Sequence, residues 1–93
     1  MNKAAVVNDV AREESLSFAR AEKVVNSFLG VIARGLANGE RVTITGFGTF
    51  EVRKRKARLG KVPRTGQRVR IPEHLTPAFI AGVGLKGKVE GKK

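Results

Sequence analysis

The sequence contains no cysteine, tryptophan or tyrosine, and it has a single histidine and a single methionine among 93 residues. Without cysteine, neither a disulfide framework nor a thiolate metal site is possible. Acidic side chains are also scarce, with 8 Asp and Glu against 19 Lys and Arg, which gives a formal net charge of +11. We expect no metal, no cofactor and no small-molecule substrate, and a polyanion is the favoured partner.

Long apolar runs are missing too. No stretch approaches the roughly 18 apolar residues of a membrane span. The apolar stretch Ala4–Val7 is broken at once by Asn8 and Asp9, so we expect no signal peptide. Binding to a membrane surface would need an amphipathic helix with a wide apolar face, which the basic part of the chain lacks. We therefore expect no membrane partner and a reducing, cytoplasmic location.

The chain is short, and we expect residues 1–93 to form a single domain. A core of this size contributes only a few kcal/mol of stability, so dimerisation, in which two half-cores complete each other, is a reasonable expectation. We expect residues 1–40 to form a helical dimerisation part and residues 41–93 to form a sheet with a C-terminal helix. The predicted fold class is α+β.

Two helices are predicted in the first part. Asn2 is a suitable N-cap ahead of a helix over Lys3–Glu14, and Ser17 can cap a second helix. The second helix ends at Asn38-Gly39, a pair suited to positive φ. Its apolar residues repeat with spacings of three and four: Ala21, Val24, Val25, Phe28, Leu29, Ile32 and Leu36.

The period then changes to two, which predicts strands over 41–45 and 49–53 joined by a turn at 46–48. The alternation continues through residue 58 but loses its apolar face, so this pair should project as a two-stranded ribbon. A turn at Pro63 and Thr65-Gly66 leads to a returning strand over 68–71 that Pro72 ends. We expect three strands with the ribbon between the second and the third, packing of residues 77–80 on the body, and a short helix over 86–93 weakened by glycines.

The ribbon coincides with a block of positive charge. Residues 53–70 hold nine Lys or Arg and no acidic residue. Residues 1–52 sum to zero, and residues 73–93 add +2. The flanking strand alternation favours a shaped arm over a disordered tail. A neutral body with one concentrated basic arm points to nucleic acid.

The motif Gly46-Phe47-Gly48-Thr49-Phe50, followed by a basic arm of this length, resembles the bacterial histone-like HU/IHF proteins, and HU most closely. The resemblance runs from Met1-Asn2-Lys3 to Leu85-Lys86. It implies an intertwined homodimer with two β-ribbon arms. These arms would wrap duplex DNA through the minor groove, with little sequence preference, and would bend and compact it as part of the nucleoid.

The resemblance also implies the site residues. Pro63 would intercalate between base pairs at the arm tip. The candidate DNA contacts are Lys3, Gly46, Arg53, Arg55, Arg58, Lys61, Pro63, Arg64, Thr65, Arg68, Arg70 and Lys86. The candidate dimer core is Phe28, Leu29, Ile32, Leu36, Phe47, Phe50 and Phe79.

The chain departs from the family pattern beside that tip and in the last helix. Val62 stands where the family commonly has asparagine, which would remove a hydrogen bond or broaden the apolar wedge. Val83 stands where a lysine is common, which removes a phosphate contact. Gly84 and Gly87 replace better helix formers.

Other functions fit the sequence less well. Residues 82–87 match G-x-G-x-x-G, but only six residues follow Gly87, so no βαβ unit can form around it. His74 has no paired base or nucleophile, which favours a surface position over catalysis and argues against an enzyme. A sequence-preferring DNA bender of the IHF type and an RNA-binding protein remain as alternatives.

Overall fold

A computed structural model of the protein describes residues 1–91. The chain divides into two compact units, one over Met1–Gly35 and one from Leu36 onward. Lys92 and Lys93, the end of the helix expected over 86–93, lie outside the described residues.

Both N-terminal helices form where the sequence predicts them. Helix α1 spans Lys3–Glu14, and the Asn2 side chain accepts a hydrogen bond from the Ala5 amide at 2.9 Å. Helix α2 spans Phe18–Ala37, and the Ser17 hydroxyl accepts one from the Arg20 amide at 3.2 Å. The predicted caps at both N-termini are therefore confirmed. No helix within residues 1–91 has the length and apolar character needed to cross a membrane.

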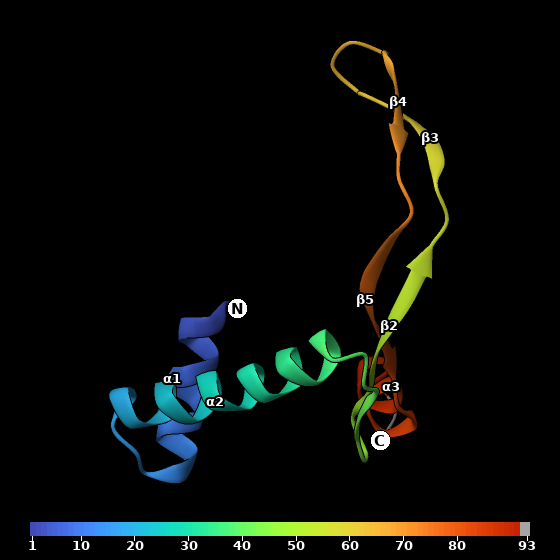
Figure 1. Cartoon of the computed structure of the whole chain (residues 1–93). Helices are drawn as coiled ribbons and strands as arrows, with labels where there is room; N and C mark the ends of the chain where they lie inside the picture. Colours follow the sequence, from blue (N-terminus) through green and yellow to red (C-terminus); the bar gives the residue numbers. More distant parts are fainter. Residues whose placement is uncertain (92–93) are drawn as a thin grey trace. The chain divides into compact units, whose positions relative to one another are not determined.

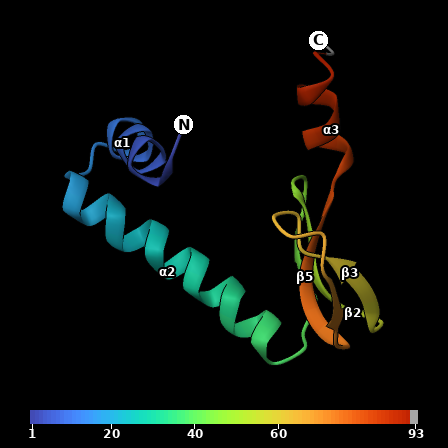
Figure 2. The same ribbon diagram turned by 90° about the horizontal axis from the view of Figure 1, so that it is seen from above.

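The helical unit buries very little on its own. Helix α1 crosses α2 (Figures 1 and 2), and Val7 and Ala21 are fully buried between them. Large apolar side chains on α2 stay open, with Phe28 53% exposed and Leu29 48% exposed. Apolar surface of this extent on a small unit is typical of an interaction face.

The second unit contains a three-stranded antiparallel sheet in the order β1-β2-β5. Its strands are β1 (Val42–Ile44), β2 (Gly48–Arg55) and β5 (His74–Ala81). The third strand is thus β5, and the expectation that residues 68–71 would return to the body as that strand is wrong. Strand β5 lies at the edge of the sheet and has only β2 as a neighbour. Pro77 has no backbone N–H to donate, and this position is tolerated because no further strand pairs with β5.

Phenylalanine rings cover one face of this sheet. Phe50 is the direct partner of Phe79, and their ring centroids lie 4.8 Å apart. Phe47, from the turn between β1 and β2, lies 5.5 Å from Phe79. The three rings therefore form one cluster, as expected of core residues.

Helix α3 spans Val83–Val89 and begins three residues earlier than predicted. The Gly82 amide donates to the Phe47 carbonyl at 2.8 Å, which anchors the start of the helix on the turn. A Cβ on Gly84 would lie 2.9 Å from the Gly46 carbonyl oxygen. Gly84 therefore permits a close approach of helix and turn, which offsets its poor helix propensity.

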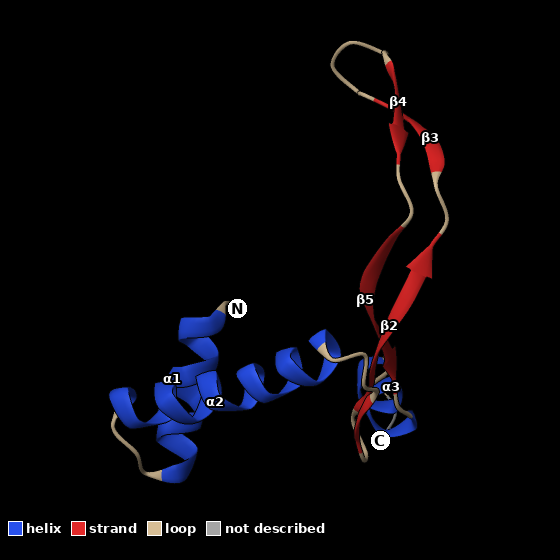
Figure 3. Cartoon of the chain, in the orientation of Figure 1, coloured by secondary structure: helices blue, strands red, loops and turns tan. Residues whose placement is uncertain are grey.

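Strands β3 (Arg58–Lys61) and β4 (Arg68–Ile71) form a separate two-stranded antiparallel sheet. The ribbon continues from β2 and β5 and projects beyond them (Figure 1). Short loop segments at 56–57 and 72–73 interrupt the outgoing and the returning segment of the ribbon at the same level (Figure 3). The sequence prediction of a projecting arm is confirmed, with a break in strand pairing at its base.

Candidate nucleic-acid interface

The arm has one cationic face and one apolar face. Leu59 pairs with Arg70 and Lys61 pairs with Arg68, which places three cations and one leucine on the same side. The opposite face carries Gly60, Val69 and Ile71 together with Arg58.

The apolar face that the sequence loses before residue 58 thus returns at Val69 and Ile71 of the returning strand. Gly60 is the physical reason that the face persists, since a Cβ there would lie 2.7 Å from the Ile71 Cδ1 atom. The Ile71 side chain occupies the space that Gly60 leaves free, and it keeps the outer arm packed without a larger core.

The tip is a closed loop between Val62 and Gln67. The Val62 amide donates to the Gln67 carbonyl at 2.8 Å, and the Val62 carbonyl accepts from the amides of Thr65 and Gly66 at 3.2 and 2.7 Å. Pro63 holds the first central position of this turn, and Gly66 adopts φ 70. The loop presents Pro63 and Arg64 in exposed positions.

Val62 itself is half-buried at the base of the loop. Its backbone closes the turn through three hydrogen bonds, so the residue serves as an anchor. The broadening of the apolar wedge considered from the sequence is therefore not favoured by this geometry. The exposed apolar surface at the tip comes from the Pro63 ring.

At the body end of the arm, acidic residues pair with two cations of the arm, Arg53 and Lys54, and with Arg41 of the body. Glu51 accepts a 2.8 Å hydrogen bond from Arg53 Nε and lies 3.3 Å from an Arg41 guanidinium nitrogen. The hydrogen bond from Arg53, aided by both guanidinium charges, lowers the pKa of Glu51 below its ordinary value of 4.5. Lys54 lies 3.6 Å from Glu73.

The remaining cations of the arm have no carboxylate partner within residues 1–91. Arg53 and Lys54 are paired as described, which leaves seven of the nine basic side chains of residues 53–70 without an ion pair. All seven are exposed: Arg55, Lys56, Arg58, Lys61, Arg64, Arg68 and Arg70. Their charge is therefore available to an external anion.

Three predicted contact residues lie outside the arm. Gly46 sits in the turn at φ 85, a conformation that L side chains rarely adopt, and Lys86 lies on α3, which is anchored to the same turn. Both are exposed. Lys3, also exposed, is the first residue of α1 and belongs to the helical unit.

The predicted dimer-core residues fall into two groups. Phe28, Leu29 and Ile32 lie on α2, and of these only Ile32 is buried. Phe47, Phe50 and Phe79 form the ring cluster on the sheet, where Phe47 and Phe79 remain 45% and 41% exposed. Leu36 is half-buried near the end of α2. Within one chain, most of these side chains are incompletely covered.

Two residues outside the predicted set lie at the base of the arm. Lys56 and His74 line a cleft together with Arg55 and Arg58. The register of β2 with β5 brings His74 to this cleft, because His74 is the direct partner of Arg55. The sequence carries no local signal for this pairing, since it depends on where β5 begins.

Comparison with known proteins agrees with this geometry. The family model described as "Bacterial DNA-binding protein" matches residues 1–90. DNA-binding protein HU 1 of Bacillus subtilis is 45% identical over 92 residues, which cover 99% of this chain and 100% of that protein. DNA-binding protein HU of Thermus thermophilus is 44% identical over 97% of this chain and 93% of its own length.

Solved structures give the same result. The HU–DNA cocrystal structure from Anabaena superposes with a TM-score of 0.86 at 40% identity, covering 96% of this chain and 97% of that chain. HU from Thermotoga maritima superposes with a TM-score of 0.67 at 29% identity, covering 96% and 98%. The chain therefore belongs to the HU group of the bacterial DNA-binding protein family, an architectural family and not one of enzymes.

Proposed function

We propose that the protein binds duplex DNA through its arm with little sequence preference, and bends and compacts it. The observation that carries this proposal is the projecting ribbon, with an exposed proline at its tip and seven exposed cations that lack carboxylate partners among residues 1–91. The Anabaena relative of similar fold was crystallised with DNA, which supports the same partner here. On this proposal the protein acts on the nucleoid.

The cationic face gives the arm its affinity for phosphate. Each phosphate neutralised by Lys or Arg releases condensed counterions, so affinity falls steeply as salt rises. Lys61, Arg68 and Arg70 lie on one face, which suits a groove with phosphates along its edges. Arginine suits a narrow minor groove especially well, because its guanidinium is planar and weakly hydrated.

The minor groove also accounts for weak sequence preference. Base edges in that groove distinguish little more than A·T from G·C pairs. A ribbon that contacts mainly phosphates and groove walls therefore reads the shape and deformability of the duplex.

The Pro63 ring is the proposed intercalating group. Apolar wedges inserted between base steps localise a bend into a kink, and flanking phosphate contacts offset the cost of unstacking. The loop hydrogen bonds of Val62 fix the tip, so Pro63 is presented on a rigid turn and loses little freedom on insertion. Arg64 and Thr65 beside it are the proposed tip contacts.

We further propose a homodimer that covers the open apolar surface. A cleft of about 540 Å³ on the helical unit is lined by Lys3 and by apolar residues of both helices: Val6, Val10, Val24, Val25, Phe28 and Leu29. A second copy presents the same surface, so an isologous interface would cover both copies at once. The exposed fractions of Phe47 and Phe79 favour further contacts between copies at the sheet.

Binding assays with several nucleic acids test the proposed function. Fluorescence anisotropy with linear, nicked and four-way-junction DNA, and with an RNA duplex of matched length, should show tight binding to each DNA. Affinity should change little when the linear sequence is scrambled. Equal affinity for the A-form RNA duplex would favour an RNA-binding protein, and strong dependence on sequence would favour an IHF-type bender.

A further inference from the structure

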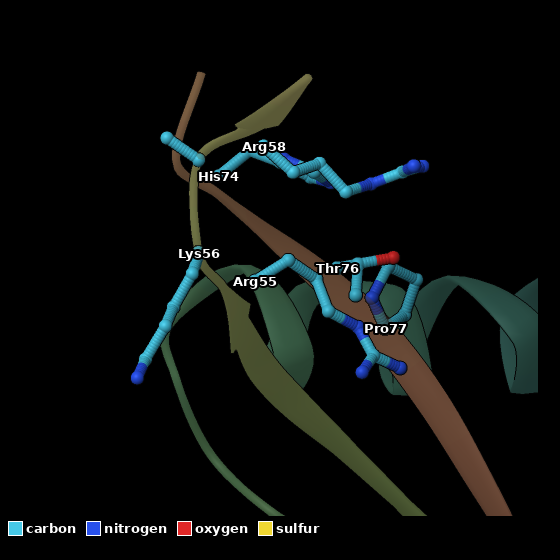
Figure 4. A pocket seen from close by; sticks show the side chains of 7 residues that line it. Arg55, Lys56, Arg58, His74, Thr76 and Pro77 are labelled. Carbon is cyan, nitrogen blue, oxygen red and sulfur yellow. The ribbon is translucent and has the colours of Figure 1, made fainter. Parts of the chain in front are cut away.

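The base of the arm contains a cleft that lies apart from the tip and from the cationic face of the outer ribbon. It has a volume of about 580 Å³ and lies where the strands break. Arg55 and Arg58 line it from one side of the ribbon, and His74 and Thr76 line it from the opposite, returning segment. Arg55 and Arg58 extend their guanidinium groups toward the same side, whereas Lys56 points the other way (Figure 4). Two arginines that reach to one side beside a histidine form a candidate anion site.

The hydrogen bond of His74 fixes which ring nitrogen can meet a ligand. Nδ1 lies 3.0 Å from the Pro72 carbonyl oxygen. A carbonyl oxygen can only accept, so Nδ1 carries a proton and donates it. Nε2 is then the atom that gains or loses a proton, and it becomes a second donor only in the charged form.

The charged groups around His74 are cations. Arg55 is its direct partner on β2, and Lys56 and Arg58 line the same cleft. The adjacent carboxylate, Glu73, instead pairs with Lys54 at 3.6 Å. No acidic side chain within residues 1–91 lines the cleft. An anion that enters the cleft would therefore be attracted by every charged side chain that lines it.

We infer that this cleft binds one backbone phosphate of the DNA. We further infer that His74 contacts this phosphate and that its contribution to the affinity depends on pH. The inference rests on the proposed binding of duplex DNA. Arg55 and Arg58 stay charged and bind the phosphate at every pH between 5 and 8, and protonated His74 adds a third positive donor. Because the phosphate stabilises the charged imidazole, DNA binding takes up a proton, and affinity rises as pH falls.

Histidine is the side chain whose charge ordinarily changes between pH 5 and 8, and His74 is the only histidine of the chain. The imidazole C–H signals in a proton NMR spectrum of the full-length protein therefore belong to this one residue and can be followed as pH is varied. Adding a duplex oligonucleotide at constant ionic strength should move the titration midpoint to higher pH. An identical midpoint with and without DNA would overturn the inference.

Binding measured against pH with variants gives a second test. Wild-type affinity for a fluorescent duplex should fall by about fivefold between pH 5.5 and 7.5, the size of effect expected for one exposed ion pair. His74→Gln should remove this dependence and bind weakly throughout. His74→Arg should bind tightly at every pH. Arg64→Gln, a tip control, should lower affinity equally at all pH values.

The outcomes separate this inference from the proposed function. If wild type and His74→Gln bind DNA with the same pH profile, His74 is not a phosphate contact, although DNA binding stands. If neither wild type nor His74→Arg binds duplex DNA at any pH, the proposed function fails and the inference fails with it.

Discussion

A Cβ atom on Gly48 would lie 2.5 Å from Cζ of Phe79, so the Phe79 ring occupies the space directly over Gly48. The same Cβ would lie 2.6 Å from the Ile80 carbonyl oxygen. Gly48 is buried and pairs with Ala81 in the sheet. The ring cluster therefore depends on the absence of a side chain at this position.

Gly48→Ala should destabilise the protein by about 2–3 kcal/mol, because both the ring and a backbone carbonyl must shift to admit the methyl group. Thermal unfolding followed by circular dichroism measures the loss. Gly87→Ala is the matched control, since no atom lies within 4 Å of a Cβ there and alanine favours the helix. A Gly48→Ala protein as stable as Gly87→Ala would contradict the packing described.

The stability of the sheet should depend on the charge of Glu51 in acid. Arg53 and Arg41 hold the pKa of Glu51 below 4.5, so the folded state favours the carboxylate. This contribution is fully present above pH 4.5 and is lost as pH falls through the lowered value. Melting temperatures of wild type and Glu51→Gln between pH 2 and 7 should differ most near neutrality and converge in acid. A constant difference across this range would exclude the proposed linkage.

Pro63→Ala should reduce DNA bending more than DNA affinity. All nine cations of the arm remain in the variant, and only the wedge that localises the kink is lost. Energy transfer between dyes at the two ends of a duplex measures the bend. An unchanged end-to-end distance in the Pro63→Ala complex would rule out intercalation at the tip.

A second copy of the chain should cover the apolar cleft on α1 and α2. Sedimentation equilibrium should give about 20 kDa, twice the chain mass of 10.1 kDa. Phe28→Glu would place a charge in the cleft and should shift the protein toward monomer or unfold it. Ala19→Glu, on an exposed position of the same helix outside the cleft, should remain a dimer. A folded wild-type monomer would contradict the shared-core proposal.

The helices could be predicted from sequence because their signals are local. Asn2 and Ser17 form the capping hydrogen bonds expected of them, and the apolar spacing of α2 extends over the whole helix. The arm could be predicted for a similar reason, since charge density and strand alternation coincide between residues 53 and 70.

The arrangement around β5 could not be predicted in the same way. Pro77 and the polar residues at 74 and 76 weaken the strand pattern, and the strand forms because its backbone pairs with β2 over eight residues. The early start of α3 likewise depends on the approach of Gly84 to Gly46, a contact between residues 38 positions apart. Tertiary contacts of this kind override local propensity.

The candidate site, too, could be predicted from the sequence only in part. The cations of the arm are visible in the sequence, but their distribution over two faces follows from the register of β3 with β4. The position of His74 opposite Arg55 follows from the register of β2 with β5. Neither register has a signal in the residues themselves.

The salt dependence of DNA binding tests the central claim most directly, namely that the arm is the surface that binds phosphate. A double variant, Arg68→Ala with Arg70→Ala, removes two cations that lie on one face of each arm. The slope of log affinity against log salt should flatten by about 1.8 for each arm that contacts the duplex, at about 0.9 per phosphate contact.

The control variant removes the same charge from the helical unit, by Lys23→Ala with Arg34→Ala, and should keep the wild-type slope. Anisotropy titrations at several salt concentrations between 50 and 300 mM give the slopes. We expect a flatter slope for the arm variant alone. Equal slopes for wild type and the arm variant would contradict it.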